Sequence, residues 1–134
     1  MALMKWSDML SVKVARFDKE HQNLIAIIND LHEAMMVGKG KEVVTSILKR
    51  LMDYTSTHFK SEELVLSQYG YPDLAQQKAE HKKFINQILD IQKQLLENKA
   101  FPTTVLSFLR DWLNNHIMKE DKKYGSYLNE KGLS

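Results

Sequence analysis

Apolar residues recur at helical spacing in four separate stretches of the chain. In the first stretch, Leu24, Ile28, Leu31 and Met35 follow one another at intervals of three or four residues, which is the spacing of one face of an α-helix. The same pattern predicts helices over about residues 18–37, 41–66, 73–98 and 103–119. Short connections make consecutive helices antiparallel, so we expect an all-α, up-down-up-down antiparallel four-helix bundle.

Residues that favour turns or helix ends separate these stretches. Gly38 follows the first stretch, and Pro72 and Pro102 precede the third and fourth, where proline restrains the residue before it. Asp18 has a side chain suited to an N-cap, so we expect an irregular N-terminal arm before it. Gly125 is expected to interrupt a short C-terminal tail. The whole chain, residues 1–134, is interpreted as one domain.

Composition excludes several classes of site and partner. The chain has no cysteine, which rules out thiolate nucleophiles, zinc–thiolate sites and iron–sulfur clusters. The 19 basic and 17 acidic residues leave a net charge of only +2, so we expect no nucleic-acid partner. No apolar run is long enough to span a bilayer and the N-terminus lacks a signal-peptide pattern. We therefore expect no membrane association, a cytoplasmic location and a monomer.

Four histidines fall one to each predicted helix, on its apolar stripe: His21, His58, His81 and His116. They lie early, late, early and late in their helices, which places them at one level of an antiparallel bundle. Burying several imidazoles without partners is costly. A shared metal ion would remove that cost, so the pattern indicates a metal centre inside the bundle.

Two carboxylates accompany these histidines. Glu62 follows His58 by four residues and so projects from the same helix face. Asp121 follows His116 by five residues, and we expect it past the helix end, where a turn would fold it back. Imidazole and carboxylate ligands without thiolate favour iron, with manganese and zinc as lesser alternatives. The set suits two ions bridged by both carboxylates.

These motifs resemble those of the hemerythrin family, in particular its single-domain bacterial members, over nearly the whole chain. The residues that carry the resemblance are Trp6, 17–22, 58–63, Tyr71, Pro72, Glu80, His81, 111–117 and Asp121.

The resemblance implies a non-haem di-iron centre, with a bridging oxo or hydroxo group, that binds dioxygen reversibly. By position, His21 and His58 would hold the iron that binds dioxygen, His81 and His116 would hold the other, and Glu62 and Asp121 would bridge them. It implies no enzymatic activity. An oxygen-consuming enzyme is a conceivable recipient of the oxygen, although no residue identifies one.

One position departs from the family pattern. Gln77 stands four residues before His81, where the family places a further histidine on the second iron. Three interpretations stay open: the amide oxygen coordinates weakly, a water fills the position, or the second iron is lost. An extra exchangeable position would favour an oxidase- or peroxidase-like activity. A helical interaction module with a vestigial metal site is the third functional alternative.

Apolar residues within one turn of the expected ligands would keep water from the site. The expected oxygen pocket consists of Leu24, Phe59, Trp112, Leu113 and Ile117.

Overall fold

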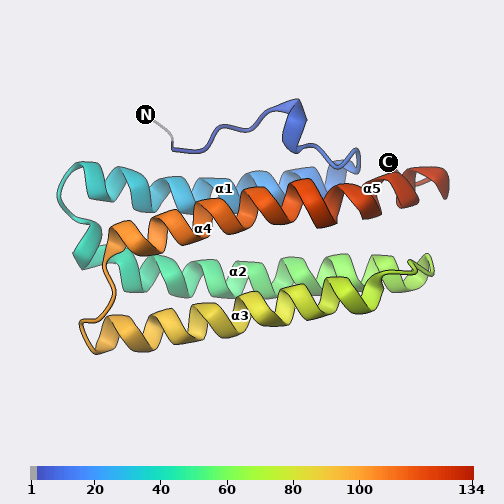
Figure 1. Ribbon diagram of the computed structural model, residues 1–134. Helices are drawn as coiled ribbons and strands as arrows, with labels where there is room; N and C mark the ends of the chain where they lie inside the picture. Colours follow the sequence, from blue (N-terminus) through green and yellow to red (C-terminus); the bar gives the residue numbers. More distant parts are fainter. Residues whose placement is uncertain (1–2) are drawn as a thin grey trace.

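A computed structural model describes residues 3–134. Four long helices lie side by side and alternate in direction (Figure 1). Their bounds are α1 (Ala15–Met36), α2 (Gly40–Gln68), α3 (Leu74–Leu96) and α4 (Pro102–His116). The predicted antiparallel four-helix bundle is therefore confirmed, and residues 3–134 contain no strand.

The N-terminal arm lies along the bundle and includes a short 3-10 helix, η1 (Asp8–Leu10) (Figure 1). The prediction that Asp18 is an N-cap is wrong, because α1 begins at Ala15 after the extended Val14. The Asp18 carboxylate instead accepts hydrogen bonds from the Val12 amide (2.8 Å) and the Ser11 hydroxyl (2.6 Å). A carboxylate in the first turn of α1 thereby holds the arm in place.

The C-terminal part differs from the prediction. The fourth helix does not end near Lys119, because α4 continues through one π-helical turn, η2 (Ile117–Asp121), into α5 (Lys122–Glu130). Gly125 does not interrupt the tail but lies buried within α5. A Cβ atom on Gly125 would lie 2.1 Å from the Val12 carbonyl oxygen, so the glycine allows the arm to approach the helix closely.

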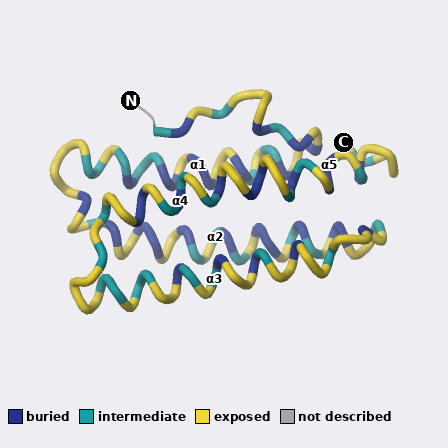
Figure 2. Tube along the Cα trace, viewed as in Figure 1, coloured by how far each residue is buried: buried dark blue, intermediate teal, exposed yellow. Residues whose placement is uncertain are grey.

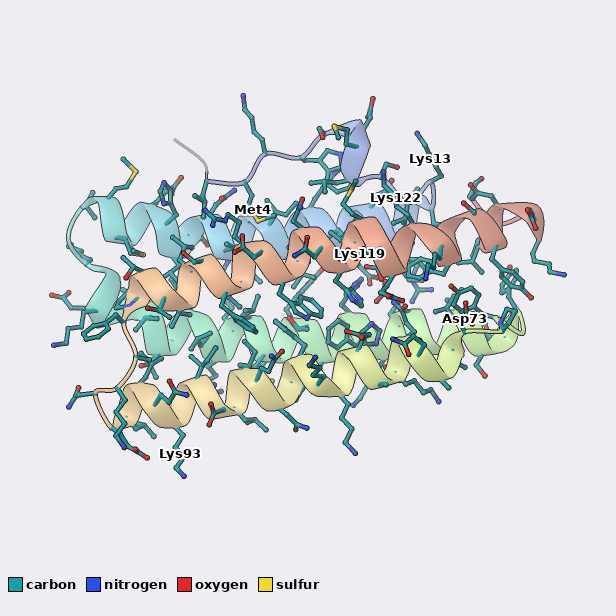
Figure 3. All side chains as sticks on the ribbon, in the orientation of Figure 1. Met4, Lys13, Asp73, Lys93, Lys119 and Lys122 are labelled. Atoms are coloured by element: carbon teal, nitrogen blue, oxygen red, sulfur yellow. The ribbon has the colours of Figure 1, made fainter. Side chains whose placement is uncertain are left out.

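Buried residues follow the inward faces of the helices (Figure 2). Charged side chains such as Lys13 and Lys93 extend away from the helices (Figure 3). This division is the amphipathic pattern that burying one helix face produces. Among residues 3–134, no helix is long and apolar enough to cross a membrane. The largest side chains with less than 2% exposure include Phe17, Ile28, Leu31, Leu48, Leu66, Ile88, Leu109, Ile117, Tyr124 and Leu128.

Candidate metal centre

The four histidines meet inside the bundle, one from each long helix. His21 lies on α1, His58 on α2, His81 on α3 and His116 on α4, and all four are buried. The ring centroids of His21 and His58 are 4.8 Å apart, and those of His81 and His116 are 5.3 Å apart. The structure therefore brings together the imidazoles that the sequence pattern placed at one level.

Glu62 lies between the two histidine pairs and is fully buried. Its Oε1 atom is 3.2 Å from His58 Nε2 and 3.3 Å from His81 Nε2, and its Oε2 atom is 3.6 Å from His21 Nε2. One carboxylate thus reaches imidazoles on three helices.

Asp121 lies close to one histidine of each pair. Its Oδ2 atom is 3.1 Å from His21 Nε2, and its Oδ1 atom is 3.1 Å from His116 Nε2. The side chain is not placed by a turn after the helix end, as we expected, but by the π-helical turn η2. A π turn has hydrogen bonds five residues apart, so residues 116 and 121 lie on the same face.

Two groups of potential metal ligands result, and they share both carboxylates. His21 and His58 belong to one group and His81 and His116 to the other, while Glu62 and Asp121 belong to both. Within each group the ligand atoms lie within 4.8 Å of one another. Sharing two carboxylates between two groups is an arrangement suited to a pair of cations.

Several atoms at this centre lack a hydrogen bond of acceptable geometry to any described residue. The buried atoms without such a hydrogen bond include His21 Nε2, Glu62 Oε1 and Asp121 Oδ2. Each nevertheless has a nitrogen or oxygen atom of another of these side chains little more than 3 Å away. Buried polar atoms are normally paired. Cations between these nitrogen and oxygen atoms would complete their coordination, so the residues fit a metal pair.

The electrostatics of these residues favour charged side chains. Burial lowers the pKa of His58, but the negative charge of Glu62 and the hydrogen bond with Glu20 outweigh it and raise the pKa to about 10. Burial raises the pKa of Asp121, yet the nearby His116 and His21 bring it down to about 2. Without metal, the centre therefore holds protons where cations would otherwise lie.

A second set of residues contacts the ligands from outside, and the sequence analysis missed it. The Nδ1 atom of His58 is 2.6 Å from Glu20, and that of His81 is 2.8 Å from Glu63. The Tyr124 hydroxyl donates a hydrogen bond to Glu62 Oε2. Such partners orient metal ligands and fix the histidine tautomer. The sequence offered one sign of the two glutamates: Glu20 directly precedes the ligand His21, and Glu63 directly follows the ligand Glu62.

Gln77 lies inside the second ligand group and is almost fully buried. Its Nε2 atom donates a hydrogen bond to Asp121 Oδ1 at 2.6 Å. The same nitrogen is 3.4 Å from His81 Nε2 and 3.5 Å from His116 Nε2. The amide nitrogen rather than the amide oxygen thus faces His81 and His116, so coordination of a cation by Gln77 would require the amide to turn over.

Aromatic rings cover the second histidine pair. The Phe59 ring stacks on His81 with 3.7 Å between centroids and 4° between planes. Trp112, which is half-buried, stacks on His116 at 4.5 Å. The other three residues of the expected oxygen pocket are buried: Leu24, Leu113 and Ile117.

Comparisons with known proteins agree with this geometry. Residues 12–128 match the family model for the hemerythrin HHE cation binding domain. A bacteriohemerythrin of Methylococcus capsulatus is 38% identical over 130 residues, which cover 96% of this chain and 98% of that protein. A bacteriohemerythrin of Stenotrophomonas maltophilia is 30% identical over a stretch that covers 92% of this chain and 80% of that protein.

Solved structures show the same relationship. The crystal structure of a wild-type hemerythrin superimposes with a TM-score of 0.84 at 37% identity, covering 93% of this chain and 97% of that one. The crystal structure of a hemerythrin variant in which a leucine is replaced by tyrosine gives a TM-score of 0.85 at 37% identity. The chain therefore belongs to the hemerythrin family, a family of di-iron, oxygen-binding proteins.

Proposed function

We propose that this protein binds dioxygen reversibly at two iron ions and acts as an oxygen carrier, store or sensor. The observation that carries the proposal is the sharing of Glu62 and Asp121 by two ligand groups. Asp121 presents one oxygen atom to each group, and Oε1 of Glu62 lies between His58 of one group and His81 of the other, which suits a bridging role between two cations. Family membership then favours iron as the metal and dioxygen as the ligand.

In this proposal each ion has two histidine ligands of its own. His21 and His58 hold one ion, and His81 and His116 hold the other. The outer contacts of Glu20 with His58 and of Glu63 with His81 keep one imidazole in each group with its Nε2 atom directed inward.

The surrounding residues protect the centre. When bound, the iron pair supplies the electrons that dioxygen binding requires. Phe59 and Trp112 cover the imidazoles of His81 and His116. This apolar cover limits access of water and of outer-sphere oxidants. No substrate needs to be turned over for the protein to work in this way.

The experiment is to load the protein anaerobically with ferrous iron and then add and remove dioxygen. We expect two iron ions per chain and a visible absorption band that appears with dioxygen and disappears when it is removed. A band that does not reverse, together with consumption of reductant, would instead establish an oxidase. Absence of stoichiometric iron, with thermal stability unchanged by a chelator, would indicate a vestigial site.

The position of Gln77 favours a second candidate function, an oxidase- or peroxidase-like activity. Its amide nitrogen lies 3.4–3.5 Å from the Nε2 atoms of His81 and His116; with the amide turned so that its oxygen faces the ion, it would offer a weaker ligand than an imidazole. A more exchangeable position at this ion would admit peroxide. The Gln77→His variant should then react more slowly with peroxide and keep its oxygen complex longer. Equal rates in the two proteins would argue against the second function.

A further inference from the structure

Exposed apolar side chains gather at one end of the bundle, where the chain turns from α1 into α2 and from α3 into α4 (Figure 1). Four large apolar side chains in these two connections are 62–81% exposed: Met36, Val37, Leu96 and Phe101. The other large apolar side chains that are exposed among residues 3–134 are spread over η1, α2, α3 and η2. A cluster of this kind is typical of an interaction surface.

The two connections form one continuous surface. A hollow of about 210 Å³ lies between the start of α2 and the connection from α3 to α4, with Val44 on one side and Phe101 on the other. Since α2 begins directly after the first connection, the hollow links the two. We call the end of the bundle formed by residues 36–42 and 93–102 the tip.

The tip carries the whole net charge of the chain. It contains four of the 19 basic residues and two of the 17 acidic residues, so the rest of the chain is neutral. Among residues 3–134, ion pairs with acidic side chains involve only two lysines, Lys49 and Lys99. The other three lysines of the tip are exposed and unpaired: Lys39, Lys41 and Lys93. Figure 3 shows Lys93 extending away from the bundle.

This combination of charge and apolar surface selects the partner. A second copy of the tip is disfavoured, because like charges would face one another. A rigid partner would need a groove that matches the side chains of two separate connections, whereas lipid headgroups rearrange around them. Apolar side chains that enter the headgroup region, flanked by lysines that face anionic lipids, are the features of a protein that lies on a membrane surface.

We propose that the tip docks on the surface of a membrane that contains anionic lipids. Its four exposed apolar side chains enter the headgroup region, and its three unpaired lysines face the lipid phosphates. The expectation of no membrane association rested on the absence of a spanning segment, and surface docking needs none. Leu96 follows His81 by 15 residues on α3, so the candidate metal centre lies about 22 Å along the bundle from the docked end. The proposal is therefore independent of the proposed function.

The test measures sedimentation of the iron-loaded protein with lipid vesicles. We expect binding to vesicles of phosphatidylcholine and phosphatidylglycerol in equal parts, weaker binding at high salt and little binding to phosphatidylcholine alone. Each lysine contributes about fivefold, so Lys39→Gln/Lys41→Gln should lower the partition coefficient about 25-fold. The control Lys60→Gln/Lys123→Gln, which removes the same charge from exposed positions outside the tip, should bind like the unaltered protein.

A second pair of variants tests the apolar side chains. Leu96→Ser/Phe101→Ser should lose most of the binding, whereas Met9→Ser/Leu89→Ser, altered at exposed apolar positions outside the tip, should keep it. Circular dichroism should show the same helical content in all variants, because every altered side chain is exposed.

Three results would overturn the proposal. Absence of binding to the anionic vesicles would leave an acidic protein segment as the alternative partner of the tip. Equal binding by the tip variants and their controls would place the contact elsewhere on the protein. Self-association that Leu96→Ser/Phe101→Ser abolishes would assign the tip to a second copy of the chain. Reversible colour on oxygenation in solution tests the proposed function separately, so the two failures are distinguishable.

Discussion

The phenol of Tyr124, on α5, donates a hydrogen bond to Oε2 of Glu62, on α2, and neither side chain is exposed to solvent. Burial and the nearby Glu62 charge raise the pKa of Tyr124 well above its ordinary value, so the hydroxyl stays protonated and remains a donor. The contact ties the C-terminal helix to the carboxylate shared by both ligand groups.

Replacing Tyr124 by Phe should therefore destabilise the iron-loaded protein. The substitution removes the donor and leaves a buried carboxylate oxygen with one partner fewer, which costs about 1–3 kcal/mol of the free energy of unfolding. Urea denaturation measures this change. Tyr54→Phe is the control, because the Tyr54 hydroxyl accepts a hydrogen bond from Asn23 in an exposed position. Equal losses in both variants would contradict the prediction.

The outer carboxylates should control iron affinity. Glu63→Gln keeps the shape of the side chain but removes the charge that faces His81 Nδ1, which is 2.8 Å away. Loss of such a partner lowers metal affinity by about 10–100-fold. Competition with a ferrous chelator measures the affinity, and the exposed Glu33→Gln serves as control. A Glu63→Gln protein with the affinity of the control would show that the contact does not orient His81.

Stability of the metal-free protein should depend on pH in a direction set by His58. Its pKa in the folded protein is about 10, against an ordinary value of 6.5, so the protonated imidazole stabilises the fold. This stabilisation is complete below about pH 6.5 and is lost as the pH rises through about 10. For Asp121, with its pKa lowered to about 2, stabilisation is present above its ordinary value of 3.8 and is lost as the pH falls through about 2.

Iron should abolish the alkaline part of this dependence. Metal ligation requires the neutral imidazole, so the iron-loaded protein does not depend on a proton at His58. Urea unfolding at pH 6, 8 and 10, with and without iron, should show a decline in the metal-free protein alone. Parallel profiles for the two forms would contradict the assignment of His58 as a ligand.

Gly125 should not accept even one methyl group. A Cβ atom would meet the Val12 carbonyl oxygen at 2.1 Å, and relieving that overlap requires the arm to move away from α5. We expect Gly125→Ala to lose about 1–3 kcal/mol of the free energy of unfolding, despite the higher helix propensity of alanine. Ser126→Ala, at the next and exposed position of the helix, is the control in thermal denaturation. A more stable Gly125→Ala protein would show that the approach of the arm is loose.

The sequence predicted the bundle because the apolar period of each long helix is strong. It also placed His21, His58, His81 and His116 at one level, since that depends only on helix direction. Asp18 and Gly125 were misinterpreted for one reason: each serves the N-terminal arm, through contacts with Val12 that no local pattern reveals. Glu20 and Glu63 were missed because each lies beside a ligand face rather than on it.

The π-helical turn between α4 and α5 adds a residue to a helix that would otherwise be continuous, and the extra residue changes its phase by about 100°. With the helix in that phase, Asp121 faces the imidazoles, and Tyr124 and Leu128 are buried in the core. Deleting any residue of 117–120 would turn all three away together. The position of the Asp121 ligand and the packing of α5 thus depend on the same helical phase. Substitutions in this segment can therefore be tolerated, whereas insertions and deletions cannot.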